Sequence, residues 1–295
     1  MELSDLTCFA TVARCGSISR AAQQLNTVQS NVTTRIRLLE DRLGAALFTR
    51  HSRGMRLTAA GHRLLPYAGQ IMALVAEARQ AVQTDGSVGG QLAIGTMETT
   101  AAVRLPALLA RYHAGFPDVD LDISTGTTAA LLDRVLDRSL DGAFVAAPVE
   151  HPDLDALPLV EEELVVVMAQ TWPDLETYRR ANPAPTAVVF RTGCSYRQRL
   201  EQYLSGAGWL PFRRLEFGTL EGILGCVSAD VGVTLLPRAA VEGSTLRTAL
   251  RILPLPPGQG RVETLFVRRR DMPQTAAMRA FVDCFEPAGT ASAAH

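Results

Sequence analysis

A glycine-rich segment at residues 85–90, Asp-Gly-Ser-Val-Gly-Gly, divides this sequence into two parts of different character. Before it, apolar residues recur with helical spacing over most of the chain. After it, short apolar runs typical of strands alternate with amphipathic helical runs. Such alternation is typical of mostly parallel sheets covered by helices. We therefore expect a largely helical N-terminal part, a hinge at 86–90 and an α/β part beyond it.

The α/β part is expected to fold as two small lobes. About ten strand-like runs in about 200 residues fit two lobes better than one sheet. The expected strands are 92–96, 119–124, 142–146, 163–168, 187–190, 215–217, 231–235, 250–255 and 262–268. The expected helices are 100–114, 128–139, 195–206, 219–229 and 274–285. The tail 287–295, rich in Ala, Gly, Ser and Thr, is expected to be disordered.

The first 43 residues predict three short helices. Helical spacing covers 3–14, Gly16 ends that helix, and Ser17 caps the next one. The third helix, 28–43, has an apolar face formed by Val32, Ile36, Leu39 and Leu43. Its opposite face is small, polar or basic and consists of Ser30, Thr33, Thr34 and Arg37. A tight turn before a helix with such a face is typical of a helix-turn-helix, and Gln29 can reach an adenine edge or a phosphate.

A β-hairpin is predicted next, with strands at 47–50 and 55–58 around a turn that contains Gly54. Arg50, Arg53 and Arg56 lie on or near its tip, where guanidinium groups suit DNA phosphates. Residues 1–60 contain eight arginines and four acidic residues, a formal charge of +4, whereas the whole chain carries −1. This asymmetry points to an anionic partner for the N-terminal part. The chain has no lysine. Arginine suits phosphate contacts, but a coding bias toward arginine explains the absence of lysine equally well.

A long helix is predicted from 58 to about 84. Its apolar residues are Leu64, Ala68, Ile71, Val75, Ala78 and Val82, which step by four and three residues. This heptad spacing favours pairing with another helix, although packing on the helix's own domain is the alternative. We prefer a dimer helix, because no β-rich core is expected before residue 90.

Several classes of protein are excluded by what the sequence lacks. The five cysteines and five histidines are scattered, which argues against a disulfide framework or a zinc site. Phosphate-binding, dinucleotide-binding and nucleophile-elbow motifs are absent, so neither an enzyme nor a cofactor is expected. A purely solute-binding module would leave the basic first sixty residues unexplained. Neither a signal peptide nor a long apolar stretch is present, so a cytoplasmic protein without membrane contact is expected.

The N-terminal sequence closely resembles the DNA-binding signature of LysR-type transcriptional regulators over residues 3–66. The matching segments are Ala21-Ala22-Gln23-Gln24-Leu25, Gln29-Ser30-Asn31-Val32-Thr33, Ile36-Arg37-Leu38-Leu39-Glu40, Leu43-Gly44, Leu47-Phe48-Thr49-Arg50 and Leu57-Thr58-Ala59-Ala60-Gly61. One departure is Val28, which stands where the family usually has Ser or Thr, so we expect Thr27 to take over the capping role. Another is Thr34, where a longer polar or basic residue is common.

The resemblance implies an architecture. A winged helix-turn-helix at 1–58 is followed by a linker helix at 59–85 and an effector-binding domain at 91–286. That domain would consist of two Rossmann-like lobes, resembling type 2 periplasmic binding proteins. Lobe I would comprise about 91–163 and 268–286, and lobe II about 164–267, with crossings near 163–170 and 262–268. The resemblance also implies a homodimer or homotetramer on double-stranded DNA, with RNA polymerase as a further partner and a small-molecule effector between the lobes.

Four strand-to-helix junctions rich in hydroxyl groups are the predicted effector site. Ligands in such lobes bind at the carboxyl ends of strands, where helix N-termini expose N–H groups. The candidate residues are Glu98, Thr99, Thr100, Thr127, Thr128, Arg191, Thr192, Gly193, Cys194, Ser195 and Thr219. Positive helix ends together with Arg191 favour an anionic effector such as a carboxylate. For any single threonine, a helix-capping role is the alternative.

Cys194 raises a second hypothesis, that of a redox-sensing regulator of the same family. It lies at a predicted helix start beside Arg191 and Arg197, which are expected to lower its thiol pKa.

Two charged runs are interpreted as structural: Glu161–Glu163 is expected to be a solvated turn, and Arg268–Arg270 an exposed strand end.

Overall fold

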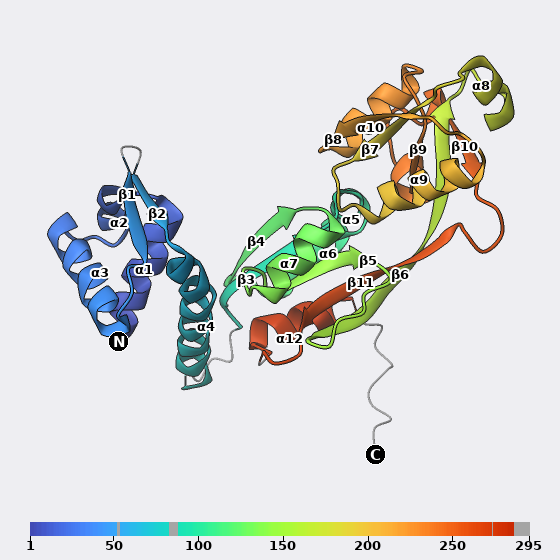
Figure 1. Cartoon of the computed structure of the whole chain (residues 1–295). Coiled ribbons are helices and arrows are strands. Elements are labelled where there is room, and N and C mark those ends of the chain that lie inside the picture. The colour runs from blue at the N-terminus through green and yellow to red at the C-terminus, as the bar shows by residue number, and fades with distance from the viewer. Residues whose placement is uncertain (52–53, 83–87, 273, 286–295) are drawn as a thin grey trace.

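The computed structural model describes residues 1–51, 54–82, 88–272 and 274–285. Figure 1 shows a small helical domain, the long helix α4 beside it, and two lobes in which helices cover a sheet. This is the winged helix-turn-helix, linker helix and two-lobed α/β architecture that the sequence predicts. No helix among the described residues is both long and apolar enough to span a membrane. Residues 86 and 87 of the expected hinge at 86–90 lie outside the described residues, as does the whole expected tail at 287–295.

The described residues of the N-terminal domain form three helices and a hairpin. Its elements are α1 (Leu3–Cys15), α2 (Ile18–Gln24), α3 (Gln29–Leu43), β1 (Phe48–His51) and β2 (Gly54–Leu57). Phe9 of α1 and Val32 of α3 are completely buried in its core. Leu43, expected in the buried stripe, is 42% exposed, because it lies in the last turn of α3, where the buried stripe has already ended at Leu39.

Gly16 and Gly54 fix how the hairpin lies against the helices. Gly16 ends α1 with a φ of 61°, a left-handed conformation that favours glycine. Its carbonyl accepts a hydrogen bond from Met55 N–H at 2.9 Å. A Cβ on Gly54 would lie 2.4 Å from that same carbonyl oxygen, so only glycine permits this approach.

Helix α4 (Ala59–Val82) packs partly on its own domain. Ala68 is completely buried, and Leu64, Leu65 and Ile71 pack against the N-terminal core. The alternative, packing on the helix's own domain, therefore holds for the first half of α4, since the helix-turn-helix itself supplies an apolar core. Farther along, Leu74 is 56% exposed. Pro66 is accommodated inside the helix.

Among the described residues, a seven-stranded mixed sheet runs through both lobes. Its strands are β3 (Gly90–Thr96), β4 (Val119–Thr125), β5 (Gly142–Ala146), β6 (Leu154–Ala169), β9 (Thr234–Pro237), β10 (Leu250–Pro254) and β11 (Arg261–Arg269). Their order is β10-β6-β11-β5-β3-β4, with β9 also paired to β6. The lobe I elements are β3 (Gly90–Thr96), α5 (Glu98–Val103), α6 (Leu105–Gly115), β4 (Val119–Thr125), α7 (Thr128–Leu136), β5 (Gly142–Ala146) and α12 (Ala276–Asp283). In Figure 1, the long strand β6 (Leu154–Ala169) rises from this lobe into the other. The lobes thus share one continuous sheet.

Lobe II lies around the far end of β6. Its elements are α8 (Leu175–Ala181), β7 (Thr186–Phe190), α9 (Ser195–Gly206), β8 (Arg213–Phe217), α10 (Leu220–Ser228), β9 (Thr234–Pro237), α11 (Arg238–Glu242), the 3-10 helix η1 (Arg247–Ala249) and β10 (Leu250–Pro254). Strand β11 (Arg261–Arg269) then pairs with β6 and β5 in lobe I.

Three expectations about secondary structure were wrong. The helix expected at 100–114 is two helices that meet at Arg104, because Pro106 in the first turn of α6 lacks an N–H group and disfavours a continuous helix. The short helices α8 and α11 were not expected. Glu161–Glu163 lie within β6 rather than in a turn, because their backbone pairs with β11. Each glutamate also has an arginine partner: Arg261, Arg104 and Arg238, respectively.

Candidate nucleic-acid interface and ligand cavity

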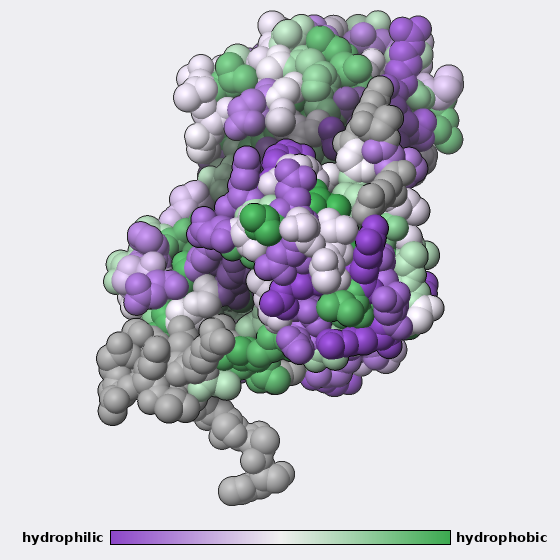
Figure 2. Space-filling view, turned by 90° about the vertical axis from the view of Figure 1, so that its left-hand side faces the viewer, coloured by the Kyte–Doolittle hydropathy of each residue, from purple (hydrophilic) through white to green (hydrophobic). Residues whose placement is uncertain are grey.

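The polar face of α3 is available for contact with a partner. Val32, Ile36 and Leu39 hold the opposite face in the domain core. On the polar face, Gln29, Ser30, Thr34 and Arg37 are exposed and Thr33 is half-buried. Figure 2 turns this domain toward the viewer and shows a mostly hydrophilic surface with separated apolar residues. A helix presented in this way can enter the major groove of DNA.

Helix α3 begins without a side-chain cap. Its N-cap is Val28, and the Thr27 hydroxyl accepts a hydrogen bond from the Asn31 side chain at 2.9 Å. The expectation that Thr27 takes over the capping role was therefore wrong, because its hydroxyl is engaged by a side chain rather than by a backbone N–H. An uncapped helix N-terminus can instead bind a phosphate through its backbone N–H groups.

The arginines of this domain have different roles. Arg35 and Arg42 form ion pairs with buried Asp5, with N–O distances of 3.2 and 3.0 Å. They hold α3 on α1 and are less available to DNA. Arg37 has no hydrogen bond or ion pair with the residues that the structure describes, and Arg56 on β2 is exposed. Arg53 and the side chain of Arg50 lie outside the described residues.

A cavity of about 420 Å³ opens between the two lobes. Its walls are the segments that follow β3, β4, β7 and β8, as expected for ligand sites at the carboxyl ends of strands. Seven of the eleven expected residues line it: Glu98, Thr99, Thr127, Thr128, Arg191, Thr192 and Cys194. Thr100, Gly193, Ser195 and Thr219 do not line it. Thr219 instead caps α10, where its side chain accepts a hydrogen bond from Gly222 N–H.

Other lining residues were missed from the sequence, among them Arg134, Tyr196 and Phe217. Arg134 lies on α7, seven residues after Thr127 and thus on the same helix face, so helical spacing carried a signal for it. It donates a hydrogen bond to the Ser124 hydroxyl at 2.9 Å. Nothing in the local pattern distinguishes Tyr196, because an aromatic side chain near a helix start is equally typical of a core position.

Buried hydroxyl groups lie where the two lobes meet at this cavity. Tyr196 of lobe II is almost completely buried, and the hydroxyls of Thr99 and Thr264 lie near enough to affect its ionisation. Burial raises the pKa of Tyr196 more than these neighbours lower it. None of the three hydroxyls forms a well-oriented hydrogen bond with the described residues. The three hydroxyls thus form a buried polar cluster where the lobes meet, behind the part of the cavity wall that Thr99 and Tyr196 contribute.

Two family models match the chain. The model of bacterial regulatory helix-turn-helix proteins of the lysR family matches residues 3–62, and the LysR substrate binding domain matches residues 85–289. This chain belongs to the LysR family. The helix-turn-helix and the two-lobed domain described above are therefore the DNA-binding and substrate-binding domains of a LysR-type transcriptional regulator.

Curated relatives agree with this assignment. YusT of Bacillus subtilis (strain 168), an uncharacterized HTH-type transcriptional regulator, is 47% identical over 291 residues, covering 99% of this chain and 97% of that protein. GltR of the same organism, an HTH-type transcriptional regulator, is 43% identical over 282 residues, covering 96% and 95%. These relatives are named as regulators and not as enzymes, in agreement with the expectation for this LysR-type chain.

Solved LysR-type structures have the same fold. A full-length OxyR variant from Pseudomonas aeruginosa is similar with a TM-score of 0.74 and 22% identity, covering 97% of this chain and 94% of that one. Full-length CbnR in complex with its target DNA is similar with a TM-score of 0.67 and 21% identity, covering 97% and 99%.

The surroundings of Cys194 differ from those expected for a reactive thiol. The side chain is 7% exposed, and burial raises its pKa more than Arg197 and backbone hydrogen bonds lower it. Arg197 is engaged by Glu201 and Glu216, at 3.0 and 2.7 Å. The expectation of a lowered pKa was therefore wrong, and the redox hypothesis for this LysR-type regulator gains no support from the geometry.

Proposed function

We propose that a small anionic molecule binds between the lobes and switches the DNA binding of this LysR-type regulator. The observation that carries the proposal is the cavity itself, in which two arginines and several hydroxyls meet at the carboxyl ends of strands. Its volume of about 420 Å³ lies in the range of small-molecule sites. The N-terminal ends of α5 and α7 add N–H groups and a favourable dipole for negative charge.

The cavity residues divide into charged and neutral partners for such a molecule. Arg191 is exposed at the mouth and has no ion pair among the described residues, and Arg134 is half-buried on α7. Either guanidinium can receive a carboxylate, with Arg191 the more available of the two. Thr99 and Tyr196 line the cavity as neutral residues, with their hydroxyls close to each other. Thr128 and Thr192 then line the remaining wall.

For DNA, we assign sequence reading to α3 and phosphate contact to the hairpin. Gln29, Ser30, Thr33, Thr34 and Arg37 would face base edges. Arg50, Arg53 and Arg56 would contact the backbone, which contributes affinity more than specificity. The similar CbnR structure was solved with its target DNA, which supports double-stranded DNA as the partner.

We further infer a homodimer that assembles into a homotetramer in the cytoplasm. The exposed apolar side chain of Leu74 on α4 would be covered by pairing with the same helix of a second copy. A regulator bound near a promoter would also contact RNA polymerase, so we include the polymerase as a further partner. The domain bounds proposed for this assembly are those expected from the sequence.

Thermal unfolding with a compound panel tests the anionic effector. The panel pairs carboxylates with their amides and methyl esters, and the full-length protein is compared with Arg191→Gln. We expect some carboxylates to raise the melting temperature of the wild type and to lose much of that effect in the variant. A footprint on the DNA upstream of the protein's own gene, with and without the active compounds, then measures the switch. Stabilisation by neutral or cationic compounds alone would refute the proposal.

A further inference from the structure

We propose that α7 mechanically couples the cavity between the lobes to the linker helix α4 within a single chain. Thr127 and Thr128, at the N-terminal end of α7, line the cavity, and Arg138, just after its C-terminal end, lies against α4. A role for this coupling in effector signalling rests on the proposed function. The coupling itself does not require a bound effector.

The N-terminal end of α7 is attached to lobe II. Ala129 N–H donates a hydrogen bond to the Gly193 carbonyl across the lobes, at 3.2 Å. Gly193 has a φ of 93°, and a Cβ there would lie 2.9 Å from the Thr127 hydroxyl oxygen. The two segments therefore touch closely. A change in the angle between the lobes must displace the start of α7 or break this contact.

The C-terminal end of α7 is attached to the linker helix. The guanidinium of Arg138 lies over the ring of Tyr67 on α4, 4.8 Å from its centroid, which is cation–π geometry. Arg138 also donates to Asp271 at 2.9 Å. Arg269 binds the same carboxylate at 2.7 and 2.8 Å and donates to the Leu136 carbonyl, the last residue of α7. The helix end, two arginines and α4 thus form one cluster.

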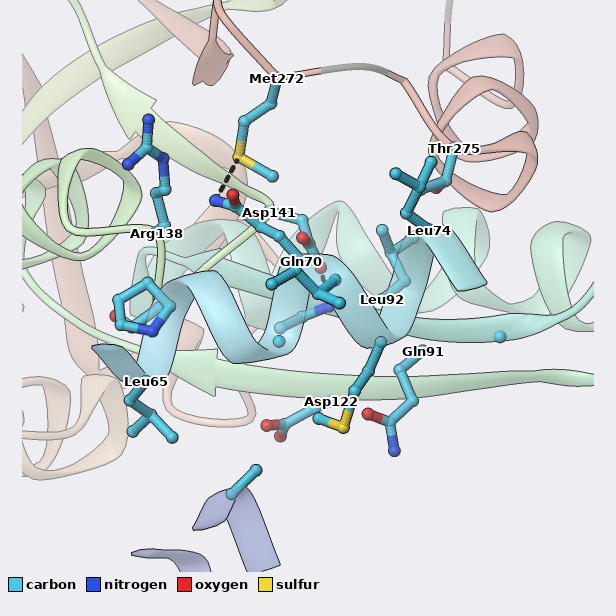
Figure 3. A pocket seen from close by; sticks show the side chains of 18 of the residues that line it. Leu65, Gln70, Leu74, Gln91, Leu92, Asp122, Arg138, Asp141, Met272 and Thr275 are labelled. Carbon is cyan, nitrogen blue, oxygen red and sulfur yellow. Dashed lines mark hydrogen bonds between the residues drawn. The ribbon is translucent and has the colours of Figure 1, made fainter. Parts of the chain in front are cut away.

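Between these ends α7 can move only as a unit. Its nine residues span about 13 Å at the usual helical rise. Leu131 and Val135 are completely buried and hold the helix on the sheet. A short helix packed in this way transmits a displacement from one end to the other better than it absorbs it. A second contact between α4 and lobe I, from Gln70 to the sulfur of Met272 at 3.5 Å, involves no residue of α7 (Figure 3).

Amide hydrogen exchange in the full-length protein tests this coupling without any ligand. We would measure the Ala129 amide in wild type, Tyr67→Leu and Arg138→Gln, with Tyr67→Phe and Gln70→Ala as controls. Tyr67→Phe keeps the aromatic ring, and Gln70→Ala removes the contact that bypasses α7. We expect Ala129 to exchange roughly three to five times faster in Tyr67→Leu and Arg138→Gln, the size of effect that a partly exposed cation–π contact allows. Both controls should stay near the wild-type rate.

Three outcomes would overturn the coupling. One is an Ala129 rate that is unchanged in both Tyr67→Leu and Arg138→Gln. Another is a rise that the Val166 amide in β6 shares, since this would indicate general destabilisation rather than a local effect. The third is an equal rise in the controls. Because no effector is added, failure of the compound panel leaves this measurement intact, and failure here leaves the anionic effector untouched.

Discussion

Arg104 donates two hydrogen bonds of 2.9 Å to the carboxylate of Glu162. Glu162 is 6% exposed and lies in β6, next to the point where that strand passes from one lobe to the other. Arg104 is the residue at which α5 ends and α6 begins. The pair thus fixes the start of α6 to the shared sheet, and the bond to Glu162 raises the pKa of Arg104.

Removing one partner of this pair should be more harmful than removing both. Arg104→Leu leaves a buried carboxylate without its cation, and we expect a loss of about 2 kcal/mol, below the value for a fully buried pair because the guanidinium is partly exposed. Arg104→Leu with Glu162→Leu should be the more stable of the two variants. Urea unfolding of both variants measures this, and equal losses would contradict the expected cost of an unpaired buried carboxylate.

Asp141 should destabilise the protein near neutral pH. It accepts a hydrogen bond from Ala93 N–H at 2.8 Å, yet burial raises its pKa above the ordinary value of 3.8. A carboxyl whose pKa is higher in the folded state contributes stability below the unfolded pKa, and that stability is lost as the pH rises through the folded pKa. Asp141→Asn keeps an acceptor oxygen and is uncharged. We expect it to unfold at a higher temperature than wild type at pH 7 and to lose this advantage below pH 4.

Gln29→Ala should weaken specific DNA binding by about 1–3 kcal/mol and leave binding to random duplexes nearly unchanged, because a base contact is lost and no phosphate contact is. Fluorescence anisotropy with the footprinted site and a scrambled duplex measures both affinities. Gln91→Ala in lobe I is the matched control and should bind both duplexes like wild type. An equal loss on both duplexes would place Gln29 on the DNA backbone.

Arg56→Ala should weaken binding to all duplexes alike. Loss of one phosphate contact reduces the slope of log affinity against log salt concentration by about 1. Titrations at several salt concentrations measure the slope, and Arg213→Ala, which removes an exposed arginine in lobe II, serves as control. An unchanged slope would remove Arg56 from the DNA interface.

Thr192→Ala and Thr100→Ala should have different effects on the response to an active compound. Thr192 lines the cavity, whereas Thr100 is buried and does not line it. We expect Thr192→Ala to weaken the compound's effect on DNA binding several-fold, by loss of about 1 kcal/mol in hydrogen bonding. Thr100→Ala should lower the melting temperature and keep the response. Gel shifts across compound concentrations distinguish the two, and the reverse ranking would contradict the assigned cavity wall.

The periodicity of the sequence determined most helices and most strands. Apolar residues at helical spacing, with Gly16 and Gly44 as stops, are sufficient to define α1 and α3, because one stripe of each helix must be buried. The hydroxyl-rich junctions after strands similarly predicted most of the residues proposed to line the cavity, because ligands in open α/β sheets bind at the carboxyl ends of strands.

Tertiary structure decided the rest, because those features depend on partners distant in sequence. Glu161–Glu163 lie in a strand because they pair with β11, which is about 100 residues away in the sequence. The thiol of Cys194 is buried by residues distant in the sequence, which no local pattern reveals. This burial raises its pKa, the opposite of the expected shift. The contact of Arg138 with Tyr67 arises only once lobe I lies beside α4. The local pattern thus defined most of the elements, whereas the burial of side chains and the charge pairing between elements depended on how the elements pack.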